Sequence, residues 1–481
     1  MDTSVEIAWA WDLFQLGGFA EVESMLSGLP LEPEIVKLLL WISIRRGDAV
    51  AKRRHGAWLS EHGGVKLAAV GRAHENVALA ALGYAIKEWF PATSKWAQAE
   101  VAYARALVAF MRNAPHEVRQ ELSAALPQIP EQRVRYADLR AWIEGLHENF
   151  ERHATHLLHA LSLAQREDVD AGLVAGIAES LAPLVRELDL GALGDRSESL
   201  LSAVAWPKDA TISRFYTQRA LAWRRALRGE WIQAMQLLDG TISMAPDAMR
   251  RGLVFADRAR IARAIGERTS AQSACGNAID CFDAIGWVDA RNEEAMGVFA
   301  AMDVLVSEQS RAEELFRRAC ALQVSKMIGA GHGRRLAAFK SFALSHLCDG
   351  DEALRHAHDA YIAFKEMKYV HRATSCALRA IELGGGARWR KRVERMIAPY
   401  PRSLEARQYE QMNSPLSKIQ GRKREVAQLL ASSNKTAREI GEALGMAEGT
   451  VRVHIKHINR ILHTENRAQL VRLVMGATDA A

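Results

Sequence analysis

The chain has 481 residues, of which 49% are hydrophobic and 25% charged, and its net charge is +6 at pH 7. This length excludes a stand-alone DNA-binding module and predicts two or three domains. Residues 416–481 hold 11 Lys and Arg against 6 Asp and Glu, so nearly all of the excess positive charge lies at the end of the chain. That concentration indicates a phosphate-binding domain there.

The N-terminus and the cysteines favour a cytoplasmic protein. The first residues lack the basic stretch of a secretory signal, and no run of 18 apolar residues occurs, so neither export nor a membrane span is expected. The five cysteines are odd in number and lack the paired spacing of metal ligands. We expect them to be reduced and mostly buried, with redox sensing as the alternative.

From Val5 to about Ala398 the sequence predicts helix after helix. Alanine and leucine dominate, the alternation typical of strands is nearly absent, and prolines such as Pro115, Pro183 and Pro246 are expected at helix boundaries. This region is therefore predicted to be all-α.

An internal repeat organises the helical region. Alanine recurs at a key small position, with intervals of 37, 41 and 41 residues, at Ala234, Ala271, Ala312 and Ala353. Around the first of these, the order of residue types resembles that of tetratricopeptide repeats: Gly229, Trp231, Ala234, Leu238 and Pro246. Further helix pairs are expected at Phe19, Val22 and Leu26 and at Phe150, Leu157 and Ala160.

Residues 1–398 are thus predicted to form a tetratricopeptide-like α-solenoid that acts as a sensor or interaction domain. The concave face of such a solenoid is a typical site for a peptide, protein or small-molecule effector. Tryptophans such as Trp206, Trp223, Trp231 and Trp287 are expected to wedge helix pairs, and the alternative is that one or two line a ligand groove.

Residues 399–415 are predicted to be an exposed linker. Pro399, Pro401 and Pro415 frame a polar run with little apolar content, which is typical of a domain boundary.

The terminal stretch, residues 416–481, carries the signals of two short helices joined by a tight turn. Thr436 and Glu439 have the spacing of a capping box, which predicts a helix start near Thr436. Gly445 is expected to end this helix, because glycine adopts the left-handed conformation of a helix C-terminus without a Cβ penalty.

The next helix is predicted to have two different faces. One face is an apolar stripe that must be buried, formed by Val451, Ile455, Ile458 and Leu462. The opposite face carries Arg452, Lys456 and Arg460 at steps of four residues. A basic second helix after such a turn fits the geometry of a helix-turn-helix that reads the DNA major groove.

These residues resemble the LuxR-type (NarL/FixJ-type) helix-turn-helix family. The family's order and spacing are matched by Arg424-Glu425-Val426, Glu439-Ile440, Thr450-Val451-Arg452-Val453-His454 and Asn466-Arg467-Ala468-Gln469-Leu470-Val471. The resemblance implies a four-helix DNA-binding domain that usually dimerises through its last helix, here about residues 465–474. The alternative, a region-4 sigma-factor motif, lacks a companion region for promoter melting upstream.

The resemblance also implies DNA-contacting residues. Base edges are expected to face Arg452, Val453 and Lys456. Phosphates are expected near Lys435, Thr436, Thr450, His457 and Arg460. This chain departs from the family at Ala447, where a capping Ser or Thr is usual, and within residues 418–421, where three residues are extra.

The function expected is therefore a DNA-binding transcription regulator that binds double-stranded DNA as a homodimer under control of the solenoid. The alternative is an interaction scaffold with a weak or vestigial DNA-binding domain. No phosphate loop, receiver pattern or catalytic constellation is present, so neither an enzyme nor a cofactor is predicted. His153, His156 and His159 recur at steps of three without a completing ligand, so no metal site is expected.

Overall fold

The computed structural model describes most of the chain. The described residues are 3–147, 149–167, 169–188, 192–207, 210–285, 292–306, 309–321, 330–413, 419, 421–432, 435–464, 466 and 468–470. The predictions made for Trp287, for Lys418 and Gln420 within 418–421 and for the end of the last helix lie outside them.

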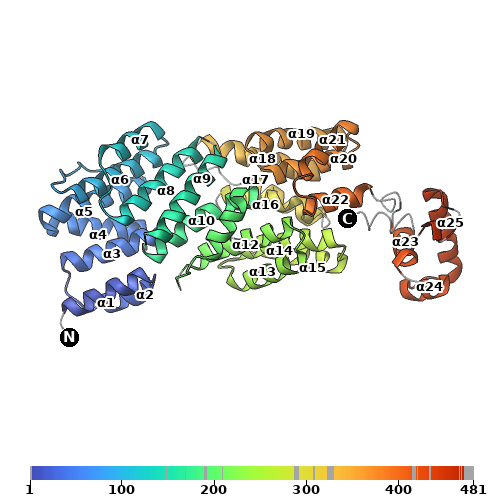
Figure 1. The fold of residues 1–481 in the computed structure, drawn as a ribbon, viewed down its shortest axis with the longest axis horizontal. Coiled ribbons are helices and arrows are strands. Elements are labelled where there is room, and N and C mark those ends of the chain that lie inside the picture. Colours follow the sequence, from blue (N-terminus) through green and yellow to red (C-terminus); the bar gives the residue numbers. More distant parts are fainter. Residues whose placement is uncertain are drawn as a thin grey trace.

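The described residues form helices and contain no strand, which confirms the all-α class (Figure 1). Up to residue 202 the helices are α1 (Thr3–Gln15), α2 (Phe19–Leu26), α3 (Pro33–Arg45), α4 (Ala49–His62), α5 (Gly64–Ala81), α6 (Lys95–Met111), α7 (Pro115–Ala124), α8 (Pro130–Leu146), α9 (Phe150–Arg166), α10 (Ala171–Glu187) and α11 (Ala192–Ser202).

From residue 211 to residue 413 the helices are α12 (Thr211–Leu227), α13 (Trp231–Met244), α14 (Ala248–Ile265), α15 (Arg268–Asp283), α16 (Asn292–Leu305), α17 (Gln309–Ala321), α18 (Ala330–Leu347), α19 (Gly350–Glu366), α20 (Val370–Glu382), α21 (Ala387–Ile397) and α22 (Leu404–Asn413). Beyond them lie α23 (Arg422–Ser432), α24 (Ala437–Leu444) and α25 (Glu448–Leu462).

Consecutive helices up to α21 pack as hairpins that stack into a solenoid, as predicted (Figure 1). The recurring alanines lie in the helix contacts: Ala234, Ala312 and Ala353 are 0% exposed and Ala271 is 6% exposed. Small side chains at these points let the axes of neighbouring helices approach closely. The pairs predicted nearer the N-terminus are also present, as α1 with α2 and α8 with α9.

Two glycines shape the hairpins predicted most clearly. Gly229 separates α12 from α13 with φ +76°, and Gly266 ends α14 with φ +86°. This left-handed conformation carries no steric penalty for glycine, so the chain reverses within a few residues.

One proline differs from its prediction. Pro115 begins α7 as expected, but Pro183 lies inside α10 rather than at a helix boundary. Proline removes one backbone donor and disfavours a helix interior. Pro183 is four residues from the end of α10, so only the last turn of the helix follows the missing backbone hydrogen bond.

The predicted linker also needs correction. Residues 404–413 form helix α22, in which Leu404, Glu405 and Ala406 are buried. This helix packs on α14 and α20, and the Gln411 side chain donates a hydrogen bond to the Ala264 carbonyl at 2.8 Å. The overall polar composition of this stretch does not reveal that Leu404 and Ala406, in the first turn of α22, are covered by the solenoid.

The cysteines are free and differ in exposure. Cys275 and Cys376 are buried, Cys281 and Cys348 are half-buried, and Cys320 is exposed. The expectation of burial thus holds for part of the set.

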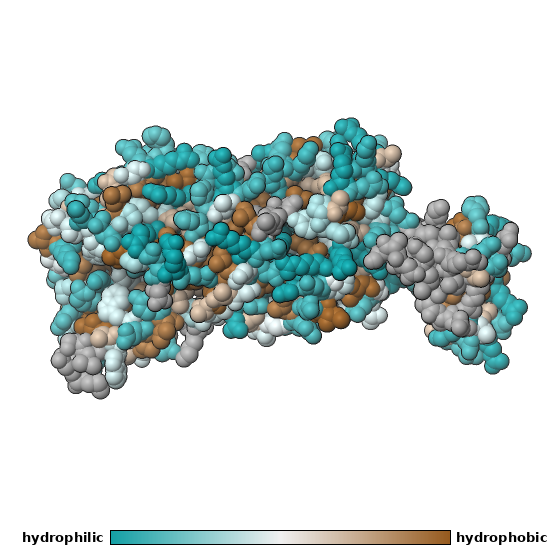
Figure 2. Space-filling model, in the orientation of Figure 1, coloured by the Kyte–Doolittle hydropathy of each residue, from teal (hydrophilic) through white to brown (hydrophobic). Residues whose placement is uncertain are grey.

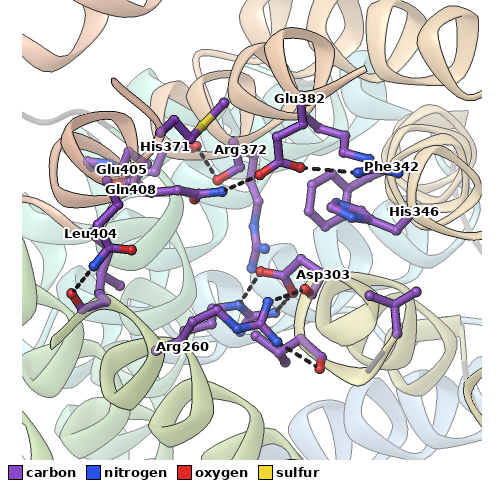
Figure 3. Close-up of a pocket in the computed structure, with 18 of the residues that line it drawn as sticks. Arg260, Asp303, Phe342, His346, His371, Arg372, Glu382, Leu404, Glu405 and Gln408 are labelled. Atoms are coloured by element: carbon purple, nitrogen blue, oxygen red, sulfur yellow. Dashed lines mark hydrogen bonds and ion pairs between the residues drawn. The ribbon is translucent and has the colours of Figure 1, made fainter. Parts of the chain in front are cut away.

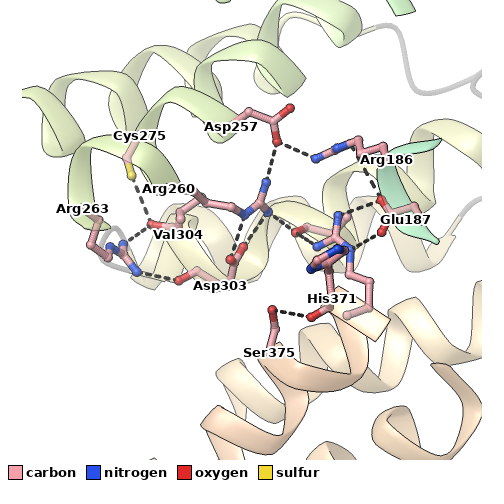
Figure 4. A network of polar contacts seen from close by, with 12 residues as sticks. Arg186, Glu187, Asp257, Arg260, Arg263, Cys275, Asp303, Val304, His371 and Ser375 are labelled. Carbon is pink, nitrogen blue, oxygen red and sulfur yellow. Dashed lines mark hydrogen bonds and ion pairs between the residues drawn. The ribbon is translucent and has the colours of Figure 1, made fainter. Parts of the chain in front are cut away.

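A network of buried ion pairs crosses the solenoid (Figure 4). Asp257 of α14 accepts hydrogen bonds from Arg186 of α10 and Arg219 of α12, both at 2.6 Å. Glu187, next along α10, accepts two hydrogen bonds from Arg372 of α20 at 2.9 and 3.1 Å. Burial alone would raise the pKa of Glu187, but these guanidinium groups lower it to about 2. The network therefore ties helices from distant repeats together by charge-assisted hydrogen bonds.

The visible surface is largely hydrophilic, with scattered apolar patches over the solenoid (Figure 2). Among the described residues, no helix is both long and apolar enough to cross a membrane.

Candidate nucleic-acid interface

Helices α23, α24 and α25 enclose a small hydrophobic core of their own. Each helix contributes residues that are fully buried, such as Val426 of α23, Ile440 of α24 and Val451 of α25, all 0% exposed. Ile419 and Leu470, which flank these helices, are 1% and 0% exposed and close the core at its edges.

The start of α24 confirms the predicted capping box. The Glu439 backbone N–H donates to the Thr436 hydroxyl at 3.3 Å, and the Glu439 carboxylate accepts from the Thr436 backbone N–H at 2.7 Å. Each side chain thereby satisfies a backbone donor that the first turn leaves unpaired. The Glu439 carboxylate accepts hydrogen bonds from the backbone N–H and the hydroxyl of Thr436, and these two bonds lower its pKa below the ordinary value.

The turn between α24 and α25 is closed by backbone hydrogen bonding. Gly445 has φ +63° and ends α24, as predicted, and the Met446 N–H donates to the Gly441 carbonyl at 2.8 Å. This pairing is that of a Schellman motif. A Cβ on Gly441 would lie only 2.5 Å from the Met446 carbonyl oxygen. The close approach of the Met446 carbonyl to Gly441 is not evident from the sequence.

Helix α25 buries the predicted apolar stripe. Val451 and Ile458 are 0% exposed and Leu462 is 8% exposed, while Ile455 is half-buried beside them. Ala447, at the N-cap position, makes no side-chain cap bond, as expected from the missing hydroxyl. The stripe fixes which face of α25 points away from the core.

All eight residues predicted to contact DNA are exposed in this structure. Val453, the apolar member of the set, is 55% exposed. Arg452, Lys456 and Arg460 share the face opposite the buried stripe, and His457 lies beside them. Thr450 lies in the first turn of α25, and Lys435 and Thr436 lie at the start of α24. Figure 2 shows a hydrophilic outer edge on this domain.

One contact on this face was not anticipated. The Arg452 guanidinium donates to the Glu448 carboxylate from Nη2 at 2.7 Å and from Nε at 3.0 Å, one turn apart on α25. Both side chains are exposed, so this pair contributes little to stability. It does orient Arg452 and offset its charge when no DNA is bound.

The segment after α25 begins a further helical turn. The Asn466 side-chain oxygen accepts from the Gln469 backbone N–H at 2.9 Å, the pattern of a helix N-cap, and Leu470 is buried in the core. The remainder of the predicted dimerisation helix lies outside the described residues.

The histidines of α9 do not come together. His153 is buried, whereas His156 and His159 are exposed. Elsewhere among the described residues, ligand atoms of Cys348, Glu352 and His356 lie within 4.8 Å of one another. Glu352 is exposed and such surface groups are common without an ion, so we assign no metal there.

The fold and this site define a class: a helical-repeat protein that ends in a helix-turn-helix. Residues 415–474 match the family model described as bacterial regulatory proteins, luxR family. This segment is therefore a LuxR-type DNA-binding domain. Such a domain places the chain among the DNA-binding transcription regulators.

Two further comparisons concern the whole chain. No curated protein sequence matches it. Among solved structures, the chain is similar to a crystal structure of a Rap protein complexed with competence and sporulation factor. That similarity has a TM-score of 0.47 and 12% sequence identity, and it covers 74% of this chain and 99% of the Rap chain.

Proposed function

We propose that this protein regulates transcription by placing α25 in the DNA major groove as part of a homodimer, under the control of the solenoid. The division of α25 into a buried apolar face and an exposed basic face carries this proposal. Arg452, Val453 and Lys456 read base edges, and Lys435, Thr436, Thr450, His457 and Arg460 hold phosphates.

Dimerisation supplies the two-fold symmetry of the DNA site. In this proposal the helix near residues 465–474 pairs with its copy, so that two α25 helices enter successive major grooves of a two-fold-related sequence. The solenoid receives an effector and changes whether the two domains can pair and bind. Residues 1–398 serve as the sensing domain and residues 416–481 as the DNA-binding domain.

Genome-wide occupancy of the intact protein tests this function. We expect the wild-type chain to enrich one two-fold-related motif. The variant carrying both Arg452→Ala and Lys456→Ala should lose that motif, while Arg355→Ala, an exposed arginine on α19, should retain it. If the wild-type chain enriches no motif, the protein acts as an interaction scaffold, and its partners on the repeats become the object of study.

A further inference from the structure

A cavity of about 390 Å³ lies among the helices of the C-terminal half of the solenoid (Figure 3). Helices α14, α16, α18 and α20 supply most of its walls, and α22 lines one side. This volume falls in the range of small-molecule sites.

Four of the five arginines that line the cavity have partners in the protein, and the fifth is Arg424 of α23, whose Nε has none among the described residues. Arg260 donates to both carboxylate oxygens of Asp303 at 2.6 and 2.8 Å. Arg379 donates to the Ser345 carbonyl at 2.9 Å and to Glu382 at 3.1 Å. These guanidinium groups therefore do not require an anionic ligand.

Other polar groups in the cavity lack a partner. His371 is 5% exposed and Glu405 is 4% exposed, and His371 Nδ1 lies 3.7 Å from Glu405 Oε1. Within the described part of the chain, His371 Nε2, Glu405 Oε2 and Trp223 Nε1 have no hydrogen-bond partner. Buried polar atoms of this kind cost free energy unless a ligand or water satisfies them.

Of the two adjacent unpartnered atoms on α20 and α22, Glu405 Oε2 is an acceptor, and His371 Nε2 is one when the ring proton is on Nδ1. Burial alone would raise the pKa of Glu405, but His371 and nearby donors hold it below its ordinary value, so the carboxylate is ionised. When His371 Nδ1–H faces Glu405, its Nε2 accepts a hydrogen bond. A ligand must therefore bring donors to this part of the cavity.

We propose that this cavity is an effector site for a compact molecule, uncharged or singly protonated, that donates hydrogen bonds to Glu405 and His371. Amines and polyhydroxylated compounds share this chemistry. A carboxylate or phosphate at the same place would instead face the carboxylate of Glu405, which has no guanidinium partner. This inference rests on the proposed function, because it names the site through which the solenoid exerts control.

Helix α22 connects the cavity to the DNA-binding domain. The Gln408 side chain donates to Glu382 of α20 at 3.1 Å, and both residues line the cavity, so α22 directly borders it. Helix α22 ends at Asn413, and Ile419 already belongs to the DNA-binding core. Because so short a segment spans at most about 20 Å, a change in the position of α22 alters where the domain is held.

Titration of the full-length chain tests the site. The probes are ethanolamine, putrescine and tyramine as amines, glucose and myo-inositol as polyols, and succinate and inorganic phosphate as anions. We expect at least one amine or polyol to bind by calorimetry and to raise the unfolding temperature, and the anions to do neither. Binding of the amines would identify the effector as an amine, and binding of glucose or myo-inositol would identify it as a polyhydroxylated compound.

Matched variants connect binding to the cavity. Glu405→Gln should lower the affinity of the bound probe by about tenfold or more, because one charge-assisted hydrogen bond is lost. His371→Phe, which keeps a ring of similar size, should also weaken binding. Glu410→Gln, the same exchange on α22 at an ion pair with Arg407 and outside the cavity, should leave the affinity unchanged.

DNA affinity, measured on the same samples, separates this proposal from the proposed function. The bound probe should change the DNA affinity of the wild-type chain by about fivefold or more. Absence of binding by all five donor probes, binding that survives both variants, or unchanged DNA affinity would each overturn the effector site. If the wild-type chain binds the probe but binds no DNA, whether the probe is present or absent, the proposed function is overturned instead.

Discussion

The side chains of α25 divide their work by position. Val451 and Ile458 are 0% exposed and hold the helix to its core, so replacing them would unfold the domain before it tested recognition. Arg452 and Lys456 project from the opposite face, where truncation removes no core contact. Effects on DNA binding can therefore be separated from effects on stability one residue at a time.

Replacing Arg452 or Lys456 by Ala should cost about 1–3 kcal/mol on the cognate site and relax the preference for particular bases there, as is typical of base contacts. Fluorescence anisotropy with the cognate duplex and a set of single-base variants measures both effects. Unchanged affinity and unchanged preference in both variants would mean that another face of α25 meets the DNA.

Replacing Arg460 or His457 by Ala should act differently. These residues are proposed phosphate contacts, so their loss should weaken binding to all sequences alike and reduce the dependence of affinity on salt. The same anisotropy series at several salt concentrations provides the slope. A base-selective loss from Arg460→Ala would contradict the phosphate assignment.

Glu448 is expected to oppose DNA binding. Its carboxylate holds the Arg452 guanidinium at 2.7 Å, and it adds a negative charge to the face that meets phosphates. Glu448→Gln should therefore raise affinity for non-specific DNA and steepen its salt dependence by about one counterion. The same exchange at Glu442, which pairs with Arg438 on α24, is the control. Equal effects of the two substitutions would show that only net charge matters.

At the level of helices, the sequence predicts α24 and α25 well because their signals are local. Thr436, Glu439 and Gly445 specify where α24 begins and ends through their own backbone neighbours. The role of Gly441 is not visible in this way, because it depends on the carbonyl of Met446 folding back onto α24. Spacing along one helix does not reveal that approach.

Helix α22 shows the opposite case, in which a local signal misleads. Prolines and polar residues in 399–415 favour an exposed linker, but most of the polar residues lie within α22 itself. Yet Leu404 and Ala406 are buried at 7% and 2% exposure because α14 and α20 cover them. A polar helix that gains its stability from a distant surface cannot be identified from its own composition. The cavity that α22 completes was unpredictable for the same reason.

The close approach at Gly441 gives a sharp prediction for the domain. Gly441→Ala places a Cβ 2.5 Å from the Met446 carbonyl oxygen, so the turn must shift. We expect a loss of about 1–3 kcal/mol in the stability of the DNA-binding domain. Gly449→Ala on α25 meets nothing within 4 Å and should be neutral or stabilising, since alanine favours helix. Thermal unfolding of both variants decides, and equal stability would refute this account of the turn.

Across the whole molecule, stability depends on charges that are buried between repeats. The helical solenoid and its repeat period follow from the sequence, because buried alanines recur at regular intervals from Ala234 to Ala353. The ion pairs between α10, α12, α14 and α20 do not follow, because they join residues far apart in the chain. These pairs and several buried histidines couple the fold of the solenoid to pH.

His153 provides the clearest test of this coupling. It is 4% exposed, neither ring nitrogen has a hydrogen-bond partner among the described residues, and burial with Arg335 nearby lowers its pKa to about 4. In the unfolded chain the imidazole of His153 has the ordinary pKa of about 6.5 and binds a proton below it. The folded state binds that proton only near pH 4, so it loses stability relative to the unfolded state as the pH falls from about 6.5 to 4.

At pH 5 this difference in proton binding amounts to about 2 kcal/mol. His153→Leu should therefore reduce the loss of solenoid stability between pH 7.5 and pH 5 by that amount, whereas His159→Leu, on the exposed face of α9, should not change it. Urea unfolding of the full chain followed by circular dichroism at both pH values measures the effect.

If His153→Leu loses stability with falling pH as steeply as the wild type and the control variant do, His153 is protonated in the folded state and the burial argument fails. Because the pKa values of His74, which is buried, and of His346, which is half-buried, are also lowered to about 4, part of the pH dependence should remain in His153→Leu.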